Sequence, residues 1–241
     1  MQILQFNPRK ETPNERIFRT YQNLRVALCV LGALLPFLVM GADYLDLKRL
    51  APRGSISAYY HSPHSLTRDI FVGELFVIGI FLFLYRGYST RENLVLDVGG
   101  LMLLGVAIFP TTPQAMPATL TFIERIAYHN FPVAGVNLTI HGICAIGFFL
   151  AIAYVATFRS KDSLEKGNPL TPMLTKIYCA LGALMIIAPV GAFIFATWTT
   201  IGIGIFLSET AGILVFAVYW AVKTWEFFGT NGAVEERLFE S

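Results

Sequence analysis

Three ionisable residues lie within otherwise apolar stretches of this 241-residue chain. Glu74, His141 and Glu209 each follow the start of such a stretch. A helical rise of ~1.5 Å per residue puts them roughly 6–12 Å below one common boundary. An ionisable group in hydrocarbon is costly and usually has a function. The three residues therefore predict a polar site at one depth in a membrane, beneath a loop that carries His61 and His64.

This group of residues could support several kinds of chemistry. Two imidazoles and two carboxylates suit Zn, Mn or Fe and leave a coordination position for water; the candidate metal ligands are His61, His141, Glu74 and Glu209. Metal-bound water, with a pKa near ~7, could attack an ester or an amide. Without a metal, the same groups could relay protons or bind a polar headgroup. The spacing does not choose between these alternatives, and no HExxH, GxSxG or Walker motif is present.

Each residue also has a purely structural explanation. Glu74 could be an interfacial carboxylate, and His141 could be a neutral core histidine bonded to a neighbouring carbonyl. Glu209 is harder to explain in this way, because it lies deep in an apolar segment between Ser208 and Thr210. In that position it must be protonated, paired or hydrated.

Six apolar segments must position these side chains. A membrane span needs about 20 mainly apolar residues, and the predicted spans are residues 24–45, 70–85, 94–109, 136–158, 177–196 and 201–225. The predicted fold is an all-α, polytopic transmembrane bundle of six helices in a single domain, 1–241, with tails at 1–22 and 226–241. Apolar residues at helical spacing within 118–129 predict a short amphipathic helix on the membrane surface.

The basic residues predict the orientation. Thirteen Lys and Arg fall on the side shared by both termini, and five fall on the other side: Lys48, Arg49, Arg53, Arg68 and Arg125. The positive-inside rule therefore places the N- and C-termini in the cytoplasm, and an even number of spans agrees with this.

The composition excludes other classes of protein. The chain is 55% hydrophobic and 14% charged, whereas a soluble domain needs about 25% charged residues. The 18 basic residues are spread over short loops, so we expect no nucleic-acid partner. Cys29, Cys144 and Cys179 all lie in apolar segments and predict no disulfide framework.

Most of the chain from residue 54 onward resembles a widespread group of small bacterial integral-membrane proteins, which we associate with Frag1-like proteins. The matching features are 56–61 (ISAYYH), Arg68-Asp69-x3-Gly73, Phe109-Pro110-Thr111, Ile140-His141, and Glu209 with Trp220 and Lys223. The resemblance implies a multi-pass protein of the bacterial inner membrane and implies almost nothing about function.

A second resemblance is shorter. Ser57-x3-His61 followed by Asp69 is similar to the Ser-x3-His…Asp pattern of progestin/adiponectin-type receptors, hemolysin III proteins and alkaline ceramidases. It implies that His61 is a zinc ligand and that Ser57 and Asp69 act on the metal-bound water or the oxyanion. The final HxxxH pair of that family has no counterpart, since no histidine follows His141.

The leading hypothesis is a membrane protein whose outward-facing polar site binds membrane lipid or a lipid-like molecule. An enzymatic version hydrolyses it with a metal such as Zn, and Ser57, Asp69 and Glu209 are the catalytic candidates. One alternative is a small transporter or channel that uses the same residues, and another is a non-catalytic sensor or assembly protein. The sequence does not predict an oligomer.

Overall fold

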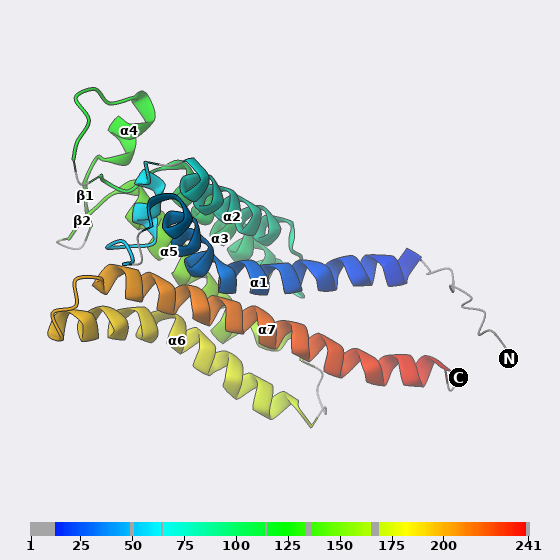
Figure 1. Ribbon diagram of the computed structural model, residues 1–241. Helices are drawn as coiled ribbons and strands as arrows, with labels where there is room; N and C mark the ends of the chain where they lie inside the picture. The colour runs from blue at the N-terminus through cyan, green and yellow to red at the C-terminus, as the bar shows by residue number, and fades with distance from the viewer. Residues whose placement is uncertain are drawn as a thin grey trace, which may run out of the picture.

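The computed structural model describes residues 13–48, 51–63, 65–113, 115–133, 136–164 and 169–239. Within this part, the fold is almost entirely helical (Figure 1). The α-helices are α1 (Pro13–Leu47), α2 (Ser65–Leu84), α3 (Thr90–Ile108), α4 (Phe122–Ala127), α5 (Ile140–Tyr154), α6 (Thr171–Trp198) and α7 (Gly204–Phe239). A 3₁₀-helix η1 (Ser57–His61), a π-helix η2 (Val155–Arg159), a 3₁₀-helix η3 (Ser160–Ser163) and two short strands complete it. The all-α prediction is confirmed.

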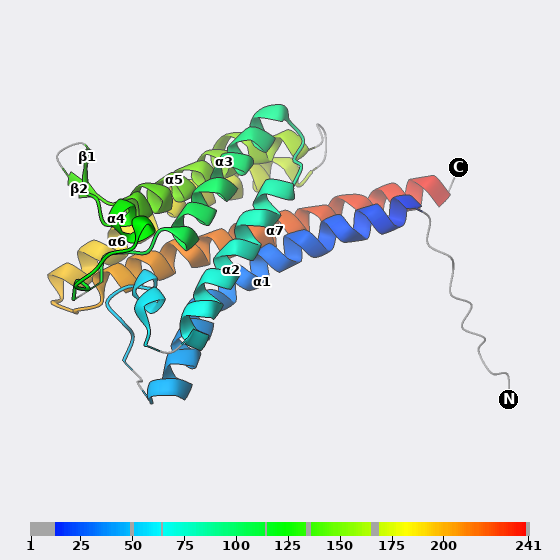
Figure 2. The same cartoon turned by 90° about the horizontal axis from the view of Figure 1, so that it is seen from above.

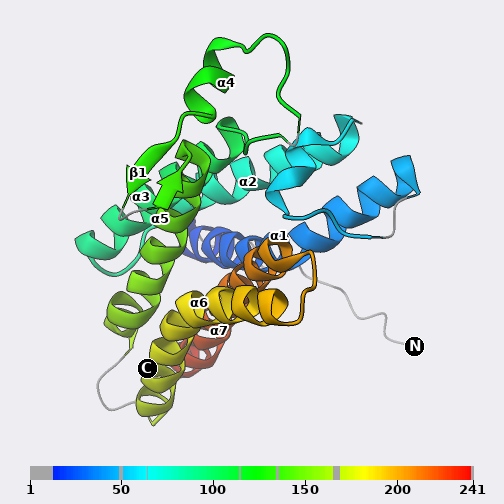
Figure 3. The ribbon, with the colours of Figure 1, turned by 90° about the vertical axis from the view of Figure 1, so that its left-hand side faces the viewer.

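The long helices contact one another in a closed ring. α1 packs against α2 and α7, α3 packs against α2 and α5, and α6 packs against α5 and α7. The α6–α7 turn, α4 and the β-strands lie at one end of the molecule, called here the loop end (Figure 2). The start of α1 and the end of α7 lie at the opposite end, called here the termini end. Viewed from the loop end, α4 stands to one side of the helices (Figure 3).

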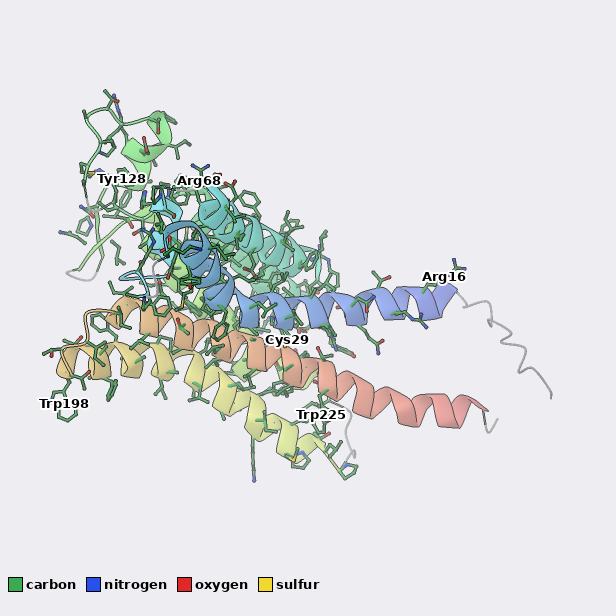
Figure 4. The ribbon with its side chains drawn as sticks, viewed as in Figure 1. Arg16, Cys29, Arg68, Tyr128, Trp198 and Trp225 are labelled. Carbon is green, nitrogen blue, oxygen red and sulfur yellow. The ribbon has the colours of Figure 1, made fainter. Side chains whose placement is uncertain are left out.

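Four helical segments in the described part are long and apolar enough to cross a membrane: Arg19–Leu45, Ile140–Ser163, Thr171–Trp198 and Gly204–Glu226. The outer faces of these helices carry exposed apolar side chains, such as Ile187 at 62% and Trp198 at 83%. Figure 4 shows Trp198 at the loop end and Trp225 farther toward the termini end. Such surfaces are those of a multi-pass membrane protein, in which lipid covers the apolar faces.

The observed elements differ from the prediction at several boundaries. Residues 13–22 of the predicted N-terminal tail 1–22 belong to α1, which begins at Pro13. The segment expected to begin a span at residue 136 instead forms the strands β1 (Phe131–Val133) and β2 (Val136–Leu138), which pair antiparallel. The span therefore starts at Ile140, where the Thr139 hydroxyl caps α5 by accepting a hydrogen bond from the Gly142 N–H. At the other end, the predicted tail 226–241 is helical as far as Phe239, because α7 continues through it.

The surface helix expected within 118–129 is α4. It begins with a capping box: the Thr121 hydroxyl accepts from the Glu124 N–H, and the Glu124 carboxylate accepts from the Thr121 N–H. The Thr121 hydrogen bonds hold the pKa of Glu124 below its ordinary value. These local bonds stabilise a helix of only six residues, which could not form on its own.

Two of the spanning helices contain an internal proline. Pro36 lies in α1 and Pro189 in α6. Proline removes a backbone donor and its ring displaces the preceding turn, so each position favours a bend. Figure 1 shows that both helices change direction along their length.

Candidate functional site

Glu209 of α7 is held by the loop at residues 51–63. Its Oε2 accepts hydrogen bonds from the backbone N–H groups of Ile56 (2.5 Å) and Ser57 (3.3 Å), and its Oε1 accepts from the Ser57 hydroxyl (2.9 Å). These N–H groups stand at the start of η1, where backbone donors have no partner within the helix. Glu209 therefore satisfies the beginning of η1 and joins this loop to α7.

Other contacts fix the same loop at both of its ends. The Phe206 N–H donates to the Gly54 carbonyl (3.0 Å). The Arg53 guanidinium (2.7 Å) and the Ser62 hydroxyl (3.1 Å) both donate to Asp43 Oδ1 near the end of α1. The Asp43 side chain is only 2% exposed, so this ion pair is largely shielded from water. The loop is thus held in one place over the helices.

His141, in the first turn of α5, completes the polar group. Its Nε2 lies 2.8 Å from Ser57 Oγ, and its Nδ1 lies 2.8 Å from the carbonyl oxygen of Phe109, the C-cap residue that follows α3. Glu209, Ser57 and His141 therefore form a continuous hydrogen-bonded chain across α7, η1 and α5. The histidine is 6% exposed.

The proton count of this chain follows from its geometry. Ser57 has one hydroxyl hydrogen, so it cannot donate to both neighbours. If Ser57 donates to Glu209, then His141 donates from both ring nitrogens and is an imidazolium. If Ser57 donates to His141, then Glu209 is protonated and donates to Ser57. In both arrangements Glu209 and His141 share one additional proton.

This arrangement differs from that of a serine hydrolase. In a Ser-His-Asp triad the carboxylate binds the histidine and leaves the serine free to attack, while backbone N–H groups hold the oxyanion. Here the Glu209 carboxylate binds Ser57 itself and occupies the N–H groups of Ile56 and Ser57. The geometry therefore suits binding or proton transfer better than attack by the Ser57 hydroxyl.

A cavity of about 60 Å³ lies next to the hydrogen-bonded side chains of Ser57 and Glu209. Ser57 and Glu209 form its polar end, and the rest of its lining is apolar. Most of the apolar residues come from α1, α2, α3, α5 and α7: Leu35, Phe71, Leu75, Leu103, Val106, Ala145, Phe148, Phe149 and Ile213. A small polar end on an apolar wall is the usual composition of a site for a small organic molecule.

The remaining predicted site residues lie apart from the hydrogen-bonded chain of Glu209, Ser57 and His141. The His61 Nε2 is 2.6 Å from the Thr111 carbonyl, and Asp69 pairs with its neighbour Arg68 on the surface. Glu74 is 7% exposed, and neither of its carboxylate oxygens has a hydrogen-bond partner. Glu74 does not line the cavity, and His64 lies outside the described residues.

The proposed ligand set does not form a group in the described residues. No set of three or more His, Cys, Asp or Glu side chains there could hold a metal ion. Of the four candidate ligands, only His141 and Glu209 are linked, and they are linked through Ser57. A zinc site and metal-dependent hydrolysis stay predictions, and no chemical step is derived from them.

Comparisons with known proteins do not identify the chain. No protein-family model, curated protein or solved structure matches it. The two family resemblances therefore stay predictions, and the geometry of the site carries the functional argument.

The sequence analysis missed a second buried polar group, at the termini end. We call it the polar lock; its members are Lys223 and Glu226 of α7, Ser160 and Ser163 of η3, and Tyr178 of α6. A lysine near the end of the predicted span 201–225 can extend toward lipid headgroups, but the Lys223 side chain is 1% exposed and bonded inside the protein. The i,i+3 spacing of Lys223 and Glu226 in an apolar helix was the available signal.

Proposed function

We propose that this chain is an integral membrane protein of six spans that binds an amphiphilic, lipid-like molecule in the cavity beside Glu209. α2 and α3 would supply the two additional spans. They are 20 and 19 residues long, and each carries three charged residues. The observation that carries the proposal is the single polar end of an otherwise apolar cavity between the helices.

The polar end indicates which chemical group the ligand presents. The backbone N–H groups of Ile56 and Ser57 are already bound to Glu209. A carboxylate has about four acceptor positions, so Glu209 can still accept a hydrogen bond from a ligand. No Arg or Lys lines the cavity in the described residues. A ligand with a hydroxyl or amine group therefore fits better than one with a phosphate, and its apolar part would lie against residues such as Phe71 and Phe148.

Replacing Glu209 with glutamine should weaken binding of 4-bromobutan-1-ol, a probe small enough for the cavity, about 10- to 100-fold. The ligand hydroxyl would donate to the ionised form of Glu209, and a hydrogen bond to a charged group contributes ~1.5–3 kcal/mol. The bromine quenches tryptophan fluorescence, and Trp220 is fully buried next to Phe216. Trp198→Phe and Trp225→Phe leave Trp220 as the only tryptophan, since the chain has 3 Trp. Quenching titrations of this protein in detergent give the affinity.

The matched control is Glu124→Gln, which makes the same change on the surface at the loop end and should leave the titration unchanged. Equal quenching of the Glu209→Gln protein and its parent would contradict a binding role for Glu209.

The proposed orientation places both termini in the cytoplasm and the cavity in the outer half. In sealed cells, Pro63→Cys and Thr112→Cys should react with an impermeant thiol reagent, and Lys161→Cys should react only after the membrane is opened. All three positions are exposed. The parent protein, with its native cysteines, sets the background. Reversed labelling would show that the protein has the opposite orientation in the membrane. Labelling of Pro63→Cys and Thr112→Cys from different sides would rule out six spans.

A transporter would use the same binding site. It also requires a way out of the cavity toward the termini end, where the polar lock lies.

A further inference from the structure

One face of α7 connects the cavity to the polar lock. Glu209, Ile213, Phe216, Trp220 and Lys223 follow one another at spacings of four and three residues, so they lie along one side of the helix. Glu209 and Lys223 are two heptads apart, or about 21 Å at helical rise. This face of α7 is therefore polar at both ends and apolar in between.

Aromatic rings lie between Ile213 and the polar lock along α7. Phe148, which lines the cavity, lies 5.5 Å from Phe216 between ring centroids. Phe216 contacts Trp220 (6.3 Å), and Trp220 contacts Tyr85 edge-on (4.9 Å). Phe216 and Trp220 are 2% and 0% exposed. These buried rings lie along α7 between the cavity and the polar lock.

The polar lock forms a second closure beyond the rings. The Lys223 ammonium donates to the Ser160 carbonyl (3.1 Å), Ser163 Oγ (2.5 Å) and Glu226 Oε2 (3.2 Å). The Ser163 hydroxyl (2.6 Å) and the Tyr178 hydroxyl both donate to Glu226. The lock thus joins α7 to η3 and to α6.

α1 is also bonded to α7 and to the residue after α2 in this region. Arg25 of α1 donates to the backbone carbonyl of Lys223 (3.1 Å) and to the Tyr85 hydroxyl (2.7 Å). Elements from both ends of the chain therefore meet at this closure.

The chemistry of the lock suits a closure that opens. A buried ion pair is a poor device for permanent stability, because well-packed apolar side chains of the same volume do as well or better. When such a closure separates, its charged groups regain hydration, whereas an apolar closure exposes surface that water disfavours. A lysine and a glutamate at this position therefore make separation less costly than apolar residues would.

Three helix irregularities lie beside the cavity and the lock. Pro36 of α1 follows Leu35, which lines the cavity. Pro189 of α6 lies against Gly212, where an added Cβ would be 3.1 Å from the proline ring, and Gly212 precedes the cavity residue Ile213. The π-helix η2 directly precedes η3, which carries two residues of the lock. Prolines and π-turns are frequent sites of helix bending and function.

We infer that the protein is a carrier whose amphiphile site opens alternately to the two sides of the membrane, with the polar lock as its gate at the termini end. This inference rests on the proposed binding function. The described structure is the form in which that gate is closed. Opening requires Lys223 and Glu226 to leave η3 and α6 and the aromatic rings to separate, while Glu209 stays at the binding site.

The test measures access to the cavity from the termini end. Ala145→Cys, which lines the cavity on α5, is the reporter in a protein whose Cys29, Cys144 and Cys179 are replaced by alanine. An impermeant maleimide is applied to the termini side in oriented vesicles. Ser163→Ala and Glu226→Gln should each increase the labelling rate about tenfold, because each weakens a hydrogen bond to a charged group that holds the gate closed.

Asp97→Asn is the control. It breaks the Arg86–Asp97 ion pair (2.9 Å) at the same end of the molecule but outside the lock, and labelling should stay at the parent rate. If Glu226→Gln does not fold, Ser163→Ala and Tyr178→Phe decide the matter, since each removes only a hydroxyl group.

Two measurements keep the two proposals apart. If the lock variants bind 4-bromobutan-1-ol like the parent but show no faster labelling, the lock is only structural and the carrier inference fails, while the binding function stands. If the parent does not bind the probe, the binding function fails, and the carrier inference fails with it.

Discussion

Replacing Lys223 with methionine is expected to lower the free energy of unfolding by about 3–5 kcal/mol, the usual cost of removing one member of a buried ion pair. The substitution keeps the length of the side chain but removes the charge that lies 3.2 Å from Glu226 Oε2. It also removes the donors to Ser160 and Ser163. Glu226 then keeps its charge in the interior of the protein without the ammonium group, next to the Ser163 and Tyr178 hydroxyl groups. Unfolding by denaturant in mixed micelles measures the change.

The double variant Lys223→Met with Glu226→Leu separates charge from packing. It removes both charges together, so most of the lost stability should return. Asp97→Asn is the matched control, because its partner Arg86 is 55% exposed and an exposed pair contributes only ~0–1 kcal/mol. A Lys223→Met protein as stable as the Asp97→Asn protein would show that the lock holds no charged pair.

The stability of the lock and its proposed role as a gate are compatible. A gate must keep the closed form dominant and still separate at moderate cost. Breaking one side of the pair costs much, whereas moving both partners together into water restores their hydration. The unfolding experiment measures the cost of removing one partner of the pair. Labelling of Ala145→Cys measures how readily both partners separate together.

The sequence singled out His141 and Glu209 because lipid cannot solvate polar groups, so both must find partners within the protein. Depth along the span placed the two residues at a similar level. Ser57, which links them, lies in a loop and was singled out only by the resemblance of Ser57-x3-His61. Depth does not give the direction in which a residue faces around its helix, and so Glu74, predicted at a similar depth, lies outside the cavity.

The lock was missed because the end of α7 was placed too early. A span that ends near Trp225 leaves Lys223 at a helix end, from which a lysine can reach the headgroups. The helix continues to Phe239, so Lys223 lies well inside it. Its neighbours Ser160, Ser163 and Tyr178 come from other elements, and sequence spacing does not show which of these meet in space.

Replacing Gly100 of α3 with alanine is expected to destabilise the protein by about 1–3 kcal/mol, the usual cost of adding a methyl group to a packed interface. α2 and α3 cross here with their backbones in contact. A Cβ on Gly100 would lie 2.6 Å from the Gly79 carbonyl oxygen and 3.1 Å from the Phe83 nitrogen. These are backbone atoms, so no side chain can turn aside and the two helices must separate.

The same substitution should also weaken binding of 4-bromobutan-1-ol, because α2 and α3 supply Phe71, Leu75, Leu103 and Val106 to the wall of the cavity. Gly73→Ala is the matched control on α2. No atom lies within 4 Å of its added Cβ, and alanine favours a helix over glycine by roughly 0.5–1 kcal/mol. The control should be neutral or slightly stabilising and should bind the probe like the parent. If Gly100→Ala and Gly73→Ala behaved alike in both assays, the two backbones would not be in contact. The crossing of α2 and α3 would then not set the width of the site.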